Sequence, residues 1–257
     1  MGRADKQTTS PGKEPRRAEL GQVDGLDLHA QYYAARTGGD FFDAVRVGSR
    51  VAFLLSDIAG SKRDADPIAS AMQDAFRTRA VELFGTGDAN LTEGVEMLVQ
   101  AVNLALIGAA SGGICFAPTL LGCYDTQLGV LAYVNAGGQT ALVDDSDGAR
   151  PLPGAGLPLG LTTHMTYQAS MQVLEPGAKL LAVTRGVITS RQSKDPFGAQ
   201  RVQALLSDMK QATAEELCFI VLEAAQTFEK KRWLRLRLGP KPELDDMTAL
   251  ALVRVTS

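Results

Sequence analysis

The chain is poor in the residues that build disulfide scaffolds and histidine-based metal sites. Its 257 residues include three cysteines, Cys115, Cys123 and Cys218, and two histidines, His29 and His164. The odd cysteine count, the apolar surroundings of all three and the lack of a signal-peptide pattern argue against a secreted disulfide framework and predict a reduced, cytoplasmic setting. The two histidines are isolated, so neither is expected to bind a metal or act as a general acid.

An excess of positive charge and a long apolar run are also missing. The net charge of -3 argues against wholesale nucleic-acid binding. No apolar run approaches the roughly 20 residues that a membrane-spanning helix needs. Hydrophobic residues make up 45% of the chain and charged residues 21%, which is typical of a globular protein with a sizeable core. The length fits one large domain or two small ones.

The hydrophobic periodicity predicts strands in clusters with two helical pairs between them. Residues 1–17 are polar and without apolar periodicity, so they are predicted to be a disordered leader before one domain at 18–257. Extended or strand-like patterns occupy 20–33, 51–55, 116–124, 130–135, 141–143, 165–173, 179–184 and 247–255. Helical spacing occupies 67–84, 91–107 with Thr92 as its cap, 205–210 and 214–228. Clustered strands favour an α+β or layered α/β/β/α fold over alternating βαβ units.

Short acidic side chains stand beside apolar, strand-like runs at three widely separated places. Asp40 lies in the run 37–43, Asp57 follows Leu54-Leu55-Ser56, and the pair Asp245 and Asp246 precedes the last strand. A β-sandwich can gather such carboxylates at one rim to hold hard divalent cations. Taken singly, each could instead be a turn residue, because aspartate side chains bond nearby backbone amides.

The ordered set of segments resembles the metal-dependent protein phosphatase (PPM) family, specifically its bacterial SpoIIE/RsbU branch. The matching segments are 38–43, 57–60, 134–138, 156–160, 174–177, 195–198 and 245–248, so the resemblance covers roughly 23–255. Ser56 replaces a usual glycine, and Gly138 replaces a usual histidine. Gly-Gly-Asp-Phe also has a superficial likeness to cyclic-dinucleotide synthases, but Phe41 stands where that motif needs an acidic residue.

The resemblance implies a PPM-type α/β/β/α sandwich of two antiparallel sheets with two Mn²⁺ or Mg²⁺ ions at one end. The implied reaction is hydrolysis of phosphoserine or phosphothreonine by a metal-bound water. Asp57 is implied to bridge the ions, with the backbone carbonyl of Ile58 as a further contact. Asp40 is implied to bind a metal directly or through water. Asp245 is implied to bind the first ion, and Asp246 is implied to be a ligand or an orienting group.

The chain departs from the family pattern at Arg185. In relatives this strand ends Thr-Asp-Gly and the aspartate binds the first ion, whereas residues 184–186 read Thr-Arg-Gly. The exchange changes the charge beside the first ion by two units. Arginine cannot lose its proton, so it would repel a metal ion there. Three outcomes stay open: Arg185 replaces the first metal between Asp57 and Asp245, it turns outward beside a weakened site, or it clamps phosphate beside one ion. Arg185 joins Asp40 and Asp57 as a candidate catalytic residue.

Two functions follow from the resemblance. The first is a Mn²⁺- or Mg²⁺-dependent serine/threonine phosphatase acting on a phosphorylated regulatory protein, such as an anti-anti-sigma (STAS) protein of a bacterial partner-switching system. The second is a pseudophosphatase, in which Arg185 disables the metal site and the domain binds a phosphoprotein without turning it over. Family members often carry sensory domains, and the chain length is expected to leave no room for one.

Two basic segments leave further alternatives open. Residues 230–237 alternate basic and apolar side chains around the single Trp233. They form either a solvated helix end followed by a short strand or a docking surface for an acidic partner or phosphorylated peptide. Residues 61–66 form either a surface loop or a place where Lys62 or Arg63 meets substrate phosphate.

Overall fold

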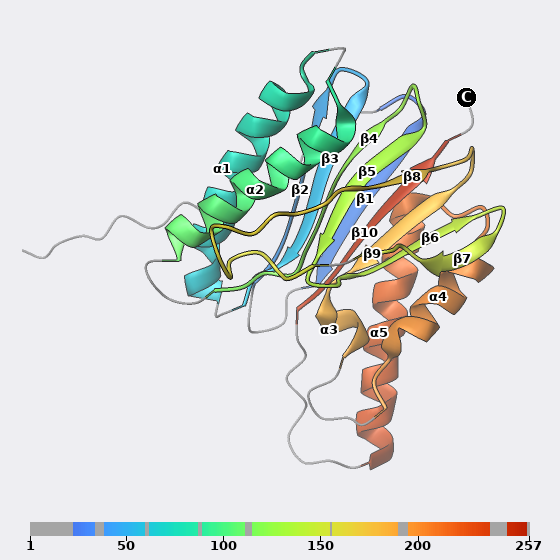
Figure 1. Ribbon diagram of the computed structural model, residues 1–257. Helices are drawn as coiled ribbons and strands as arrows, with labels where there is room; N and C mark the ends of the chain where they lie inside the picture. The colour runs from blue at the N-terminus through green and yellow to red at the C-terminus, as the bar shows by residue number, and fades with distance from the viewer. Residues whose placement is uncertain are drawn as a thin grey trace, which may run out of the picture.

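A computed structural model places two antiparallel sheets face to face between two layers of helices (Figure 1). It describes residues 23–33, 39–59, 62–86, 89–110, 115–154, 156–189, 195–236 and 246–255, with the side chains of 62–64 and 231–236 left out. The predicted leader at 1–17 and Asp245 lie outside these ranges. The α+β class and the layered α/β/β/α sandwich predicted from the sequence are confirmed.

Each sheet has five antiparallel strands. One sheet has the order β1 (Leu26–Tyr33), β10 (Met247–Arg254), β9 (Lys179–Val183), β6 (Thr140–Asp145) and β7 (Gly148–Pro151). The other has the order β2 (Asp40–Val47), β3 (Arg50–Asp57), β4 (Thr119–Asp125), β5 (Val130–Ala136) and β8 (Ser170–Val173). The first is called the β10 sheet and the second the β3 sheet below.

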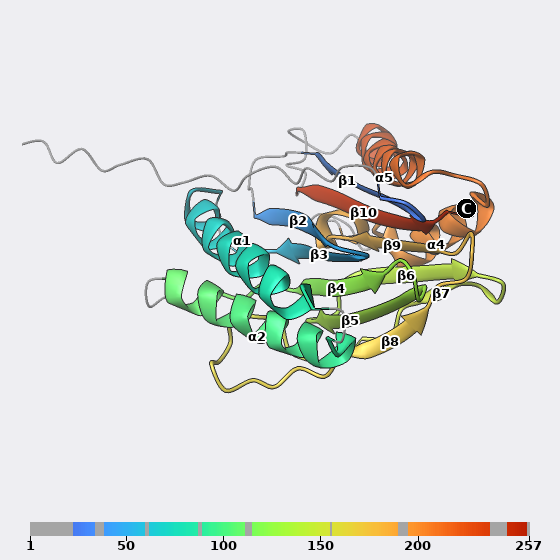
Figure 2. The same ribbon diagram turned by 90° about the horizontal axis from the view of Figure 1, so that it is seen from above.

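Helices cover the outer face of each sheet, as Figure 2 shows from above. The helix pair α1 (Lys62–Phe84) and α2 (Leu91–Ala109) covers the β3 sheet. The helices α4 (Gly198–Asp208) and α5 (Ala214–Leu236) cover the β10 sheet, and the short α3 (Arg185–Ile188) follows β9 directly. Apolar side chains fill the three interfaces between these four layers. Strand β3 is buried on both faces, which explains its unbroken apolar run at 51–55.

The structure corrects several predicted element boundaries. Helix α1 begins at Lys62 and contains Pro67, rather than beginning at that proline. Helix α2 is capped by Asn90, not Thr92: Asn90 Oδ1 accepts from the backbone N–H groups of Thr92 and Glu93 at 3.1 and 3.2 Å. Asparagine is a strong N-cap residue because its side-chain oxygen satisfies amides that the first helical turn leaves open.

Other corrections concern segments whose local pattern was ambiguous. The strand predicted at 165–173 is confined to β8, because residues 161–169 run along α2 instead of pairing with a sheet. Strand β7 and helix α3 were not predicted, being four residues long each. Helix α5 continues to Leu236, through the short strand that the sequence suggested within 230–237. The side chains that would form the proposed basic docking surface lie outside the described residues from 231 onward.

Among the residues that the structure describes, one helix is long and apolar enough to cross a membrane by length and composition. It is α2, whose mean hydropathy reaches 1.2. The sequence prediction that no apolar run approaches this length is therefore wrong for this helix. Val95, Leu98, Val102 and Leu106 are buried along one side of α2 and belong to the core between the helix pair and the β3 sheet. This packing is typical of a core helix.

Candidate functional site

The strand ends that carry the predicted site residues meet at one end of the sandwich. Asp40 opens β2 and Asp57 closes β3, and the two are direct partners in the antiparallel ladder. In the other sheet, Thr184 follows β9 and Asp246 precedes β10. The backbone N–H of Thr184 donates to the carbonyl oxygen of Thr248 at 3.0 Å, which keeps these two strand ends together. This pairing places Asp40 and Asp57 side by side at the same end of the β3 sheet.

Two threonines hold Asp40 from the opposite sheet. The hydroxyls of Thr184 and Thr248 each donate to Asp40 Oδ2 at 2.6 Å. The backbone N–H of Thr248 donates to Thr184 Oγ1 at 3.0 Å, and both threonines are fully buried. These bonds join the β3 sheet to the β10 sheet at the rim. Thr184 and Thr248, called the threonine pair below, were not singled out as site residues from the sequence.

The carboxyl group of Asp40 is hard to ionise in this setting. Burial raises its pKa from 3.8 to about 7, although the hydroxyls of Thr184 and Thr248 oppose the shift by stabilising the carboxylate. The charges of Asp57 and Asp246 raise the pKa further. Asp57 and Asp246 therefore lie close enough to Asp40 to repel its carboxylate. Asp40, Asp57 and Asp246 are called the carboxylate rim below.

This shift predicts that Asp40→Asn stabilises the metal-free protein at alkaline pH. The folded pKa of about 7 exceeds the unfolded value of 3.8, so the cost of ionising Asp40 is absent below about pH 4, grows as the pH rises, and is complete above about pH 7. Asparagine cannot ionise. We expect a gain of up to about 4 kcal/mol at pH 8 and a clearly smaller gain at pH 5.

Urea unfolding in a chelating buffer at both pH values measures this effect. The exposed Asp74→Asn exchange on α1 is the control, and it should change stability at neither pH. Equal gains for Asp40→Asn at pH 5 and pH 8 would contradict the raised pKa of Asp40.

Arg185 forms an ion pair with Asp57 but remains largely exposed. Its Nε atom lies 3.6 Å from Asp57 Oδ2, longer than a good hydrogen bond. The Arg185 side chain is 62% exposed and that of Asp57 is 14% exposed. The guanidinium therefore stands at the surface beside Asp57 rather than deep among the carboxylates. Asp245, the other carboxylate that Arg185 was predicted to contact, lies outside the described residues.

Two further residues complete the surroundings of the rim. Tyr32, on β1, donates a hydrogen bond to the buried Asp246; burial and the charge of Asp246 both raise the pKa of the Tyr32 phenol. The sequence carried no signal for Tyr32, because its place depends on the pairing of β1 with β10 opposite Thr248. Gly39 has a φ of +137°, and a Cβ there would lie 2.4 Å from the carbonyl oxygen of Ile58. Only glycine allows the strand ends to approach this closely.

The donor set suits one divalent cation better than two. Asp40, Asp57 and the Ile58 carbonyl offer the oxygen ligands that hard cations prefer. Within the described ranges, no group of three or more His, Cys, Asp or Glu side chains has metal-binding spacing. Among the described residues, Arg185 brings a positive charge next to Asp57. One divalent cation held by Asp40 and Asp57 would offset negative charge there, whereas a second would meet the positive charge of Arg185.

Several other predicted features take structural roles. Ser56, which replaces a glycine of the family pattern, is buried and hydrogen bonded to Thr119 Oγ1 at 2.8 Å. Gly138, which replaces a histidine, occupies a turn with a φ of +70°. His29 is partly buried on β1 and His164 is exposed, and neither lies on the carboxylate rim. These positions therefore add no ligand or acid to the site.

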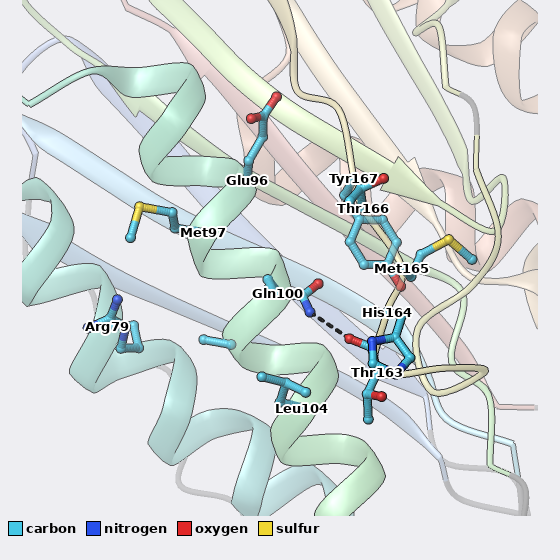
Figure 3. Close-up of a pocket in the computed structure, with 11 residues that line it drawn as sticks. Arg79, Glu96, Met97, Gln100, Leu104, Thr163, His164, Met165, Thr166 and Tyr167 are labelled. Atoms are coloured by element: carbon cyan, nitrogen blue, oxygen red, sulfur yellow. Dashed lines mark hydrogen bonds between the residues drawn. The ribbon is translucent and has the colours of Figure 1, made fainter.

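A groove of about 680 Å³ lies away from the rim, on the outer side of α2 (Figure 3). Met97 and Leu104 of α2 form one wall, and the segment 163–167 forms the other. Gln100 Nε2 bridges the walls by donating to the carbonyl oxygen of Thr163 at 3.0 Å. No residue of the carboxylate rim lines this groove. The candidate site therefore lies at the converging strand ends, and this groove is not part of it.

Comparison with known proteins places this arrangement in a family. The family model described as stage II sporulation protein E (SpoIIE) matches residues 48–255. Protein IcfG of Synechocystis sp. is 26% identical over 249 residues, which cover 88% of this chain and 38% of IcfG. The chain thus spans less than two fifths of the length of that relative.

Solved structures share the fold at low sequence identity. The RsbU and RsbW domains of Rv1364c from Mycobacterium tuberculosis give a TM-score of 0.70 at 24% identity, over 91% of this chain and 63% of that chain. The PP2C phosphatase domain with a regulatory fragment of SpoIIE from Bacillus subtilis gives 0.68 at 14% identity, over 90% of this chain and 64% of that chain. The fold is therefore that of PP2C-type phosphatase domains.

Divalent metals occur in structures of this fold. RsbX was solved in complex with magnesium, with a TM-score of 0.60 at 16% identity over 92% of this chain and 99% of that chain. The catalytic domain of PstP was solved with two manganese ions, with a TM-score of 0.55 at 15% identity over 90% of this chain and 100% of that chain. Proteins with this fold thus use the kind of ion that oxygen-rich rims bind.

Proposed function

We propose that this chain, which belongs to the SpoIIE family of PPM-type phosphatase domains, binds a phosphorylated regulatory protein at its carboxylate rim with one divalent cation. Hydrolysis of the phosphoryl group is slow, because Arg185 stands where relatives carry a metal-binding aspartate. The observation that carries this proposal is the ion pair between Arg185 and Asp57 at the rim. It adds a fixed positive charge to a site whose relatives use a second ion.

The charge balance supports a requirement for a cation. A phosphoryl group carries up to two negative charges and would be repelled by Asp40, Asp57 and Asp246 alone. Arg185 offsets one of those charges, and its exposed, planar guanidinium can donate two parallel hydrogen bonds to phosphoryl oxygens. Asp40, Asp57 and the Ile58 carbonyl would hold the ion, with Asp245 and Asp246 as further proposed ligands or orienting groups. When bound, a Mn²⁺ or Mg²⁺ ion supplies Lewis-acid stabilisation of phosphoryl charge and activates water.

In this proposal, Arg185 determines how fast the phosphoryl group is hydrolysed. Arg185 orients the phosphoryl group but provides no ligand for a second ion, so stabilisation of the transition state is weaker than with two ions. The partner class is a serine- or threonine-phosphorylated, STAS-like protein of a bacterial partner-switching system, encountered in the cytoplasm. The relatives named above motivate this class, since the fold is that of RsbU and SpoIIE domains.

A metal-free pseudophosphatase is the second candidate. It is favoured by the absence of a three-ligand cluster among the described side chains and by the contact between Arg185 and Asp57. In that case the domain would bind its phosphorylated partner with equal affinity in the presence of Mn²⁺ and of a chelator. The two candidates therefore differ in one measurable property, the cation dependence of phosphopeptide binding.

Calorimetric titration of Mn²⁺ into the metal-stripped protein tests the proposal. We expect one site in the wild-type protein and its loss in Asp57→Asn, because that exchange removes the carboxylate next to Arg185. Asp195→Asn, on the exposed segment before α4, is the matched control and should bind as the wild type does. A phosphoserine peptide should then bind more tightly with Mn²⁺ than with a chelator. No Mn²⁺ binding at millimolar concentration would rule out the one-cation site.

A further inference from the structure

We propose that Thr184 and Thr248 are positioning residues that hold Asp40 as a ligand through a single oxygen atom. This inference rests on the proposed function, because it concerns the same cation site. The threonine pair saturates Asp40 Oδ2 with two hydroxyl donors at 2.6 Å each. Oδ1 is then the oxygen of this carboxylate left for a cation.

The hydrogen-bond directions follow from the donors present. Thr184 Oγ1 accepts from the backbone N–H of Thr248, so its single hydroxyl hydrogen is committed to Asp40. The hydroxyl of Thr248 likewise donates to Asp40. Both hydroxyls are buried, so breaking either bond would leave a buried polar group without its partner, which is unfavourable. The carboxyl group is thus held in one orientation.

The threonine pair also connects the two halves of the rim. Asp40 belongs to the β3 sheet, whereas Thr184 and Thr248 belong to the β10 sheet. Asp40 is the ladder partner of Asp57, Asp57 is ion paired with Arg185, and Arg185 follows Thr184 in the chain. These contacts close a ring through both sheets. A shift of the threonine pair would therefore move Asp40 and the backbone of Arg185 together.

Thr→Val and Thr→Ser exchanges separate positioning from packing. Valine keeps the shape of threonine but removes the hydroxyl, whereas serine keeps the hydroxyl and removes a methyl group. Removing the partner that orients a metal ligand typically costs 10–100-fold in metal affinity. We expect Thr248→Val and Thr184→Val each to weaken Mn²⁺ binding by at least about 10-fold. The corresponding serine variants should stay within about threefold of the wild type.

Thr119 supplies a matched control. It is also buried on a strand near the rim, and its hydroxyl contacts Ser56 Oγ and the carbonyl oxygen of Ala117 rather than a carboxylate. Thr119→Val should therefore lower the free energy of unfolding while leaving Mn²⁺ affinity unchanged. Urea unfolding of every variant in a chelating buffer reports on packing, and calorimetric Mn²⁺ titration reports on positioning.

The titrations should be made in the wild-type background and with Arg185→Asp. If Mn²⁺ binds and the valine variants bind it as tightly as their parent, the positioning role is wrong while the cation site stands. If serine fails to restore the affinity that valine loses, packing rather than the hydroxyl is responsible, and the inference is again wrong. If neither background binds Mn²⁺, Asp40 is not a cation ligand, and the inference falls together with the proposed function.

Discussion

Replacing Arg185 with aspartate is expected to raise Mn²⁺ affinity at least about 100-fold and to convert a one-site titration into a two-site one. The exchange removes the positive charge beside Asp57 and adds a carboxylate at the same strand end. A hundredfold change corresponds to roughly 2.7 kcal/mol, modest for two charge units next to a divalent cation even with solvent screening. Hydrolysis of a phosphoserine substrate should rise in parallel, because a second ion would share the phosphoryl charge.

Two variants control for charge in general and for the arginine side chain itself. Arg150→Asp makes the same charge change at the opposite end of the sandwich, where Arg150 pairs with Asp145, and should leave Mn²⁺ affinity unchanged. Arg185→Lys keeps the positive charge and should gain no affinity. If Arg185→Asp binds Mn²⁺ no better than the wild type, Arg185 does not limit the metal site, and its departure from the family pattern needs another explanation.

Removing Arg77, the ion-pair partner of the buried Asp43, is expected to cost about 3–5 kcal/mol of unfolding free energy. Asp43 is fully buried on β2, and Arg77 of α1 donates to its two oxygens from Nε and Nη2, at 2.6 and 2.8 Å. Arg77→Met keeps much of the side-chain length but leaves the carboxylate without this cation. The effect should also reach the site, because β2 carries Asp40 three residues earlier.

Chemical denaturation in a chelating buffer measures this loss, and α1 offers its own control. Arg79 lies two residues after Arg77 on the same helix, and Arg79→Met removes its exposed ion pair with Glu82. It should cost less than about 0.5 kcal/mol, since surface ion pairs contribute little. The double variant Asp43→Leu with Arg77→Met should be more stable than Arg77→Met alone, because no buried charge remains. If Arg77→Met and Arg79→Met lower the free energy of unfolding by similar amounts, the ion pair between Asp43 and Arg77 stabilises the fold no more than a surface pair does.

The fold and the position of the site were largely determined by the sequence alone. Strand and helix periods are local properties, so the layered sandwich follows from patterns such as the apolar run at 51–55 and the spacing along α2. The order of the acidic segments identified the family and placed Asp40 and Asp57 at a common rim. It also marked Arg185 as the departure from the family pattern that is predicted to alter the metal site. The roles of Asp245 and Asp246 remain predictions.

Only the tertiary structure decided how the rim is held together. Thr184 and Thr248 meet Asp40 across 144 and 208 residues of chain, and no local pattern records contacts over such distances. The placement of Tyr32 against Asp246 depends in the same way on the pairing of β1 with β10. The exposure of Arg185 depends on the short helix that it begins. Local propensities set each strand, but the packing of two sheets determines which oxygen of Asp40 is bonded and which is left for a cation.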